Sequence, residues 1–154
     1  MARDYFQSKD GIINLVLLVL NAVNFICIVP AVTTSVSNAF MVAAIVPAVT
    51  TSVSNAFMVA AIMGFIITAA FTVAHFSGFT LKVEWPWPFM EIIYTEIWML
   101  YYFIVTGILI SMAITQYIPA GIFGFITAIT YLVKSLSIYM TKIATDANIA
   151  YVRQ

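Results

Sequence analysis

The stretch "IINLVLLVLNAVNFICIV", residues 12–29, decides the fold class. It holds no charged side chain, and a helix of about 20 apolar residues is long enough to cross the hydrocarbon core of a bilayer. The surrounding chain is similar, because no Asp, Glu, Lys or Arg lies between Asp10 and Lys82, or between Glu96 and Lys134. The 154 residues are 64% hydrophobic and 8% charged, against about 25% charged in ordinary soluble domains. The composition therefore predicts a multi-pass helical membrane protein.

Hydropathy and its interruptions predict four spans, at residues 12–29, 55–76, 92–115 and 118–140. The segments before the first span, between the second and third, and after the fourth contain Lys and Arg, whereas the two opposite loops contain neither. This is the positive-inside pattern of a four-span protein with both termini in the cytoplasm. We therefore expect an all-α, integral membrane four-helix bundle, formed by residues 1–154 as a single domain.

A tandem duplication complicates the count of crossings, because "IVPAVTTSVSNAFMVAA" occupies residues 28–44 and again 45–61. A fifth crossing would move Lys82, Lys142 and Arg153 to the outside, against the positive-inside rule. A 17-residue step also rotates a helix by ~1700°, about 100° short of whole turns, so the copies would present different faces. We expect Pro30 to end the first span, and the tract to lengthen the first outer loop or to extend the second helix with a bend at Pro47. A functional extracellular element is the alternative.

Three stretches together resemble the MARVEL tetraspan family, most closely its chemokine-like-factor-like and MAL/plasmolipin members. They are "INLVLLVLNAVNFICI", "WPWPFMEIIYTEIWMLYYFIVTGILISMA" and "IPAGIFGFITAITYLVKSLSIYM". They are similar to the family's long aliphatic first helix, its third helix with an aromatic and acidic entry, and its fourth helix. The chain departs from the family in the duplicated tract and in Lys134, where an acidic residue is expected. The resemblance implies membrane apposition, vesicle trafficking or junction work, and no catalysis.

Ionisable residues inside predicted spans are expensive and call for partners. Glu96 lies near the cytoplasmic start of the third span, and Lys134 lies near the cytoplasmic end of the fourth. Antiparallel helices bring these two residues to similar depth, so we predict an intramembrane Glu96–Lys134 ion pair, with His75 in the same leaflet. The three residues form either a structural cluster or an ion relay. The structural alternative is favoured because transport sites usually lie near the midplane.

Asn14, Asn21 and Asn24 share one face of the first helix through spacings of seven and three. Asparagine hydrogen-bonds between helices in membranes, and small residues allow close helix approach. We therefore predict that the three asparagines, Gly64 and Gly124 make helix–helix contacts. Packing within the bundle is the favoured role, and docking of a partner helix is the alternative.

The segment "EWPWPFM" adds Trp85 and Trp87 as predicted interfacial anchors, because tryptophan rings sit at headgroup level. Pro88 is placed to start the third helix.

Catalysis has little support, because one His and one Cys supply neither a metal cluster nor a thiol pair. No catalytic residue, metal or cofactor is expected, and no basic stripe suggests nucleic acid. The predicted function is non-enzymatic: organising membrane apposition, vesicle trafficking or junctions through lateral association with lipids and other integral membrane proteins, with homo-oligomers possible. The expected location is the plasma membrane or endomembrane vesicles. A small channel or transporter, or an accessory subunit that uses a Glu/His/Lys cluster, is the alternative.

Overall fold

A computed structural model describes residues 8–38, 46–79, 86–112 and 115–152 of the chain. The described part is all-helical. Its elements are α2 (Lys9–Asn38), α3 (Val46–Phe76), α5 (Trp87–Ser111), the short 3₁₀ turn η1 (Thr115–Tyr117) and α6 (Ile118–Val152).

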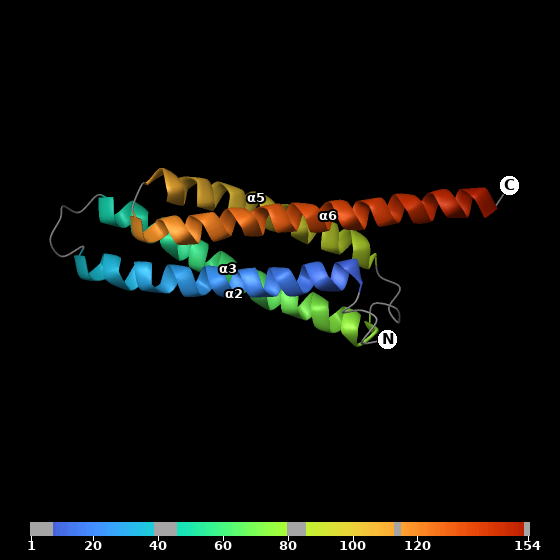
Figure 1. The fold of residues 1–154 in the computed structure, drawn as a ribbon, viewed down its shortest axis with the longest axis horizontal. Helices are drawn as coiled ribbons and strands as arrows, with labels where there is room; N and C mark the ends of the chain where they lie inside the picture. The colour runs from blue at the N-terminus through green and yellow to red at the C-terminus, as the bar shows by residue number, and fades with distance from the viewer. Residues whose placement is uncertain (1–7, 39–45, 80–85, 113–114, 153–154) are drawn as a thin grey trace.

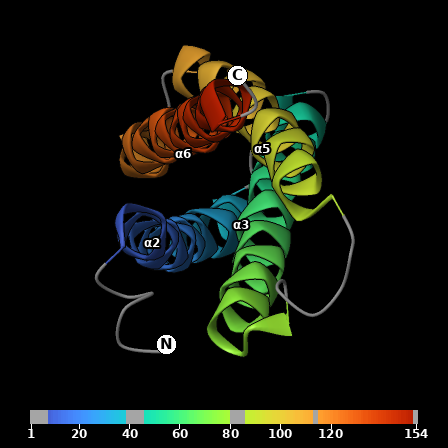
Figure 2. The same ribbon diagram turned by 90° about the vertical axis from the view of Figure 1, so that its right-hand side faces the viewer.

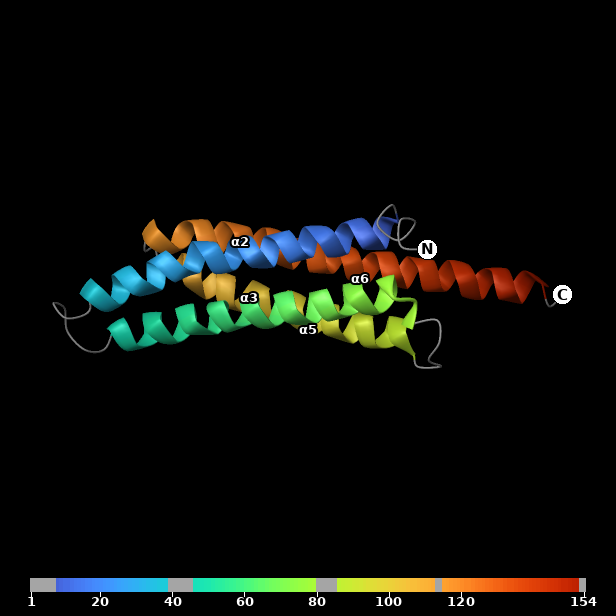
Figure 3. The same cartoon turned by 90° about the horizontal axis from the view of Figure 1, so that it is seen from below.

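The four long helices run alternately up and down as an antiparallel bundle (Figure 1). Seen from one end, α2 packs beside α3, α3 beside α5, α5 beside α6 and α6 back against α2 (Figure 2). The first residues of α2 and α5 therefore lie at the same end as the last residues of α3, and α6 continues beyond that end (Figure 3). We call this the N-terminal end of the bundle.

Four helices are long and apolar enough to cross a membrane, with candidate spans Lys9–Val29, Ser52–Phe76, Trp87–Ser111 and Ile118–Ile143. This confirms the prediction of an all-α protein with four candidate transmembrane helices. The orientation with both termini in the cytoplasm stays a prediction.

Helix boundaries differ from the sequence prediction at two places that matter. α2 does not end at Pro30 but continues to Asn38. α5 begins at Trp87 rather than at residue 92, with a proline in its first two positions. Proline is tolerated in a first helical turn because the amide that it lacks would have no intrahelical partner there. The earlier start of α5 brings Glu91 inside the helix.

The duplicated tract covers the C-terminal end of α2 and the N-terminal end of α3. The first copy begins in α2, and α3 begins at Val46, one residue into the second copy. Within the described residues, the tract therefore forms the last part of α2 and the first half of α3. Among residues 28–29 and 52–61, the part of the two copies whose burial the structure describes, the buried residues are Ile28 in α2 and the group Ser54, Phe57, Ala60 and Ala61 in α3.

The interior of the bundle is unusually polar. In α2 the fully buried side chains recur every three or four residues, at Asn14, Leu17, Asn21, Asn24 and Ile28. Large hydrophobic side chains are exposed along all four helices. This arrangement suits a bilayer, because lipid solvates apolar side chains well, whereas polar ones need partners from other helices.

Candidate functional site

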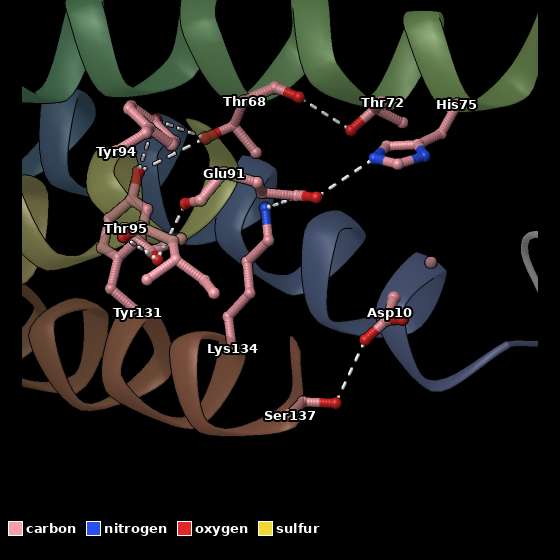
Figure 4. A network of polar contacts seen from close by, with 12 residues as sticks. Asp10, Thr68, Thr72, His75, Glu91, Tyr94, Thr95, Tyr131, Lys134 and Ser137 are labelled. Carbon is pink, nitrogen blue, oxygen red and sulfur yellow. Dashed lines mark hydrogen bonds and ion pairs between the residues drawn. The ribbon is translucent and has the colours of Figure 1, made fainter. Parts of the chain in front are cut away.

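A charged cluster lies at the N-terminal end of the bundle, where α3 ends and α5 begins. Glu91 stands in the second turn of α5 and is buried. Its Oε1 lies 2.7 Å from Lys134 Nζ of α6, and its Oε2 lies 3.2 Å from His75 Nε2 of α3. One carboxylate thus joins three helices (Figure 4).

Lys134 is the most unusual member of the cluster, because its side chain is completely buried. Its ammonium lies 2.7 Å from the Glu91 carboxylate and 5.8 Å from the centre of the Phe71 ring, a cation–π distance. A buried ammonium is costly unless an opposite charge compensates it. Glu91 supplies that charge.

The predicted Glu96–Lys134 pair is corrected by this geometry. Lys134 pairs with Glu91, and Glu96 accepts a short hydrogen bond from Ser135 Oγ. Glu91 and Glu96 are five residues apart, so they point about 140° apart around α5. The prediction failed because it started the third span at residue 92 and so left Glu91 outside. The spacing of Glu91, Thr95 and Tyr102, all buried, was the signal for the inner face of α5.

A second polar network crosses the centre of the bundle. Asn21 Nδ2 donates to Tyr131 OH at 3.1 Å, and Tyr102 OH donates to Asn21 Oδ1 at 2.6 Å. Thr68 Oγ1 lies 3.3 Å from Tyr131 OH and 2.9 Å from Tyr94 OH. These contacts join α2, α3, α5 and α6. The rings of Tyr102 and Tyr131 stack at 6.0 Å, so aromatic side chains fill the space between the helices.

All three predicted asparagines lie inside the bundle. Asn14, Asn21 and Asn24 are fully buried, and Asn24 Nδ2 donates to Thr127 Oγ1 at 2.8 Å. Because these side chains face other helices of the same chain, they do not form an outward docking face. The tyrosines that complete the network were not predicted from the sequence.

Gly64 and Gly124 lie at close helix approaches. A Cβ added at Gly64 would meet Asn21 Oδ1 at 2.7 Å and Trp98 Nε1 at 3.0 Å, and one at Gly124 would meet Thr106 Oγ1 at 2.5 Å. At both positions, the lack of a glycine side chain therefore lets polar side chains of neighbouring helices contact the helix backbone directly.

Of the two predicted anchors, Trp87 is the first residue of α5 and is partly buried, with its ring 5.8 Å from that of Phe79. Trp85 lies outside the described residues.

A cavity adjoins the charged cluster on the side of the N-terminal end. It has a volume of about 290 Å³, and its lining includes Asp10 of α2, His75 and Glu91 of the cluster, and Lys142 of α6. Asp10 also ties α2 to α6, because its Oδ1 accepts a hydrogen bond from Ser137 Oγ at 3.1 Å. We call this space the end cavity. Within the part of the chain that the structure describes, no group of three or more His, Cys, Asp or Glu side chains is placed to hold a metal ion.

Comparison with known proteins finds no family model, no curated protein and no solved structure that matches the chain. The fold defines the class, a helical protein with four candidate transmembrane spans. The resemblance to MARVEL proteins stays a prediction.

Proposed function

We propose that this chain is a non-enzymatic multi-pass membrane protein that organises membranes, in trafficking, apposition or junctions, through lateral association with lipids and other membrane proteins. The observation that carries the proposal is the inward use of polar side chains. Asn21, Thr68, Tyr94, Tyr102 and Tyr131 bond to one another inside the bundle. Such contacts stabilise membrane proteins by about 0.6 kcal/mol each on average. Because these polar groups bond to one another within the chain, the bundle is a self-contained unit.

Along the spans, the outer surface offers a partner mainly apolar packing contacts. Exposed aliphatic and aromatic residues cover each helix, and the most exposed on the four spans include Ile26, Val73, Ile104 and Met140. In a bilayer, helix association depends on van der Waals fit rather than on a hydrophobic driving force. A surface of this kind suits lateral contact with other apolar helices and with acyl chains.

The centre of the bundle supports association over conduction. A conduction path needs polar groups that face water, whereas the polar groups at the bundle centre face one another. The Tyr94 and Tyr131 rings meet edge to face at 5.9 Å, and the Phe57 and Tyr102 rings do so at 5.8 Å. These rings occupy the space that a permeating ion would need.

A small channel or transporter is the second candidate, and the charged cluster is the observation that favours it. Intramembrane ionisable residues mark ion or proton pathways in many transporters. Glu91 lies between His75 and Lys134 and lines the end cavity. Such a transporter would show ion flux in proteoliposomes that the Glu91→Gln variant loses.

Photo-cross-linking tests the proposed function on all four faces. A photoreactive residue is placed in the full-length chain at position 26, 73, 104 or 140, which are 65%, 63%, 61% and 64% exposed. The inward position 102, with no exposed surface, is the matched control on α5. The expected result in native cells is a protein adduct from one or more outward positions and none from position 102. Adducts to lipid alone at all four positions, together with Glu91-dependent flux, would overturn the proposal.

A further inference from the structure

The end cavity is assembled from all four helices, and its charges are mixed. Asp10 comes from α2, His75 from α3, Glu91 from α5 and Lys142 from α6, with Pro88 and Ile138 as apolar walls. Four segments that are far apart in the sequence thus bring acidic and basic groups to one small space. Lys142 is exposed and Asp10 is half-buried, so both are accessible from the cavity.

The balance of charge selects the kind of ligand. Asp10 and Glu91 supply two negative charges, whereas Lys142 in the lining and Lys134 behind Glu91 supply two positive ones. With His75 neutral the site carries no net charge. A simple anion would face two carboxylates, and a simple cation would face two ammonium groups. A zwitterion satisfies both signs, because its anionic group turns to Lys142 and its cationic group turns to Asp10.

The depth and size of the cavity identify the source of the zwitterion. Asp10 directly precedes the charge-free run of α2, Lys142 is the first charged residue of α6 after Lys134, and Glu91 lies one turn inside α5. These positions correspond to the headgroup layer of one leaflet. The volume of about 290 Å³ is at the lower end of small-molecule pockets. It suits a headgroup whose acyl chains stay in the bilayer.

We propose that the end cavity binds the phosphate and ammonium of a zwitterionic phospholipid headgroup such as phosphatidylethanolamine. The phosphate is held by Lys142, and the ammonium is held by Asp10. This inference deepens the proposed function, on which it rests, by naming the class of lipid that associates with the chain and the place where it binds. The predicted orientation puts the lipid in the cytoplasmic leaflet.

The test uses the full-length chain in nanodiscs that contain equal parts of phosphatidylethanolamine and phosphatidylglycerol. Native mass spectrometry after detergent release counts the lipids that the chain retains. Lys142→Gln and Asp10→Asn remove one charge each from the lining, and both amides keep hydrogen-bonding capacity. Lys9→Gln is the matched control, because it removes an exposed positive charge at the same end from a residue that does not line the cavity.

The expected result is one retained phosphatidylethanolamine per chain, with retention lowered about tenfold or more in Lys142→Gln and in Asp10→Asn, as for loss of a charge-assisted hydrogen bond, and unchanged in Lys9→Gln. Equal retention in the wild type and both cavity variants would overturn the proposal. So would preferential retention of phosphatidylglycerol, which would indicate an anionic ligand. Displacement of the lipid by equimolar free phosphoethanolamine would point to a soluble zwitterion and overturn the lipid source.

The outcome is independent of the test of the proposed function. If lipid retention is insensitive to Lys142 and Asp10 while the outward positions still cross-link to a protein, this inference alone fails. If retention follows the prediction and no protein adduct forms, the lipid site stands and lateral association with proteins fails.

Discussion

Neutralising Glu91 tests the charged cluster most sharply, because it leaves Lys134 buried without its counter-charge. Lys134 has no exposed side-chain surface, and its ammonium lies 2.7 Å from Glu91 Oε1. Removing one partner of a buried ion pair costs about 3–5 kcal/mol, and an uncompensated lysine at mid-bilayer costs about 2.5–3.5 kcal/mol on insertion scales, less towards the interface. A glutamine at position 91 still accepts a hydrogen bond. We therefore expect Glu91→Gln to lower the free energy of unfolding by about 2–3 kcal/mol.

The matched control is Glu96→Gln on the same helix. Glu96 is partly exposed and accepts its bond from a neutral serine, Ser135, so this change should cost less than about 1 kcal/mol. A double-mutant cycle adds Lys134→Met to each glutamate variant. The methionine removes the buried charge, so the Glu91→Gln/Lys134→Met double variant should return to within about 1 kcal/mol of the wild type.

The assay is unfolding of the purified chain in mixed micelles by increasing SDS, followed by tryptophan fluorescence and circular dichroism. The Glu91–Lys134 pairing is contradicted if Glu96→Gln costs as much as Glu91→Gln, or if Lys134→Met rescues the Glu96 variant and not the Glu91 variant. Either result would restore the Glu96–Lys134 pair that the sequence predicts.

Three further changes follow from the same geometry, and the same SDS unfolding measures each of them. Gly64→Ala puts a methyl 2.7 Å from Asn21 Oδ1 and should destabilise the bundle by about 1–3 kcal/mol. The control Gly107→Ala meets nothing within 4 Å and should be neutral or stabilising by up to about 1 kcal/mol. Equal effects of the two changes would contradict the close approach at Gly64. Tyr102→Phe loses the 2.6 Å bond to Asn21 and should cost about 0.6–1.7 kcal/mol, so an unchanged stability would place that hydroxyl elsewhere. Deleting residues 45–61 leaves the identical residues 28–44, which can replace the deleted start of α3. The connection between α2 and α3 then shortens, and stability should change by less than about 1 kcal/mol, because connection length has a weak effect; loss of the folded state would show that the repeat is structural.

The spans were predictable because composition alone decides them. A charge-free run of apolar residues in lipid has few options other than a helix, so the four candidate spans follow from hydropathy. Helix ends were less predictable. Pro30 was expected to end the first span, yet the helix continues to Asn38. Proline removes one backbone hydrogen bond but does not by itself force a helix to end, so the boundary depended on more than local sequence.

The charged cluster was predictable in kind but not in detail. A buried lysine required an acidic partner at similar depth, and both Glu91 and Glu96 met that condition once α5 was known to begin at Trp87. The choice between them depends on the rotation of α5 against α6, which a five-residue spacing alters by about 140°. Rotation is set by packing across the bundle, and no local pattern reports it.

The central network, too, was predictable only in part. The inner face of α2 was evident from three asparagines on one side of a long aliphatic helix. Their partners were not, because tyrosines within a span are as compatible with the membrane interface as with the core. Tyr94, Tyr102 and Tyr131 meet only after α5 and α6 are placed side by side.

Labelling with a photoactivatable lipid determines whether polar side chains face inward and apolar ones face the bilayer. The wild-type chain in nanodiscs is irradiated with a phospholipid that carries a diazirine in its acyl chain, and modified residues are located by mass spectrometry. We expect adducts at Ile26, Val73, Ile104 and Met140, and none at Asn21, Tyr102 or Tyr131. Adducts concentrated on the asparagine and tyrosine positions would show that the polar face lies towards lipid, and would contradict both the bundle and the function proposed for it.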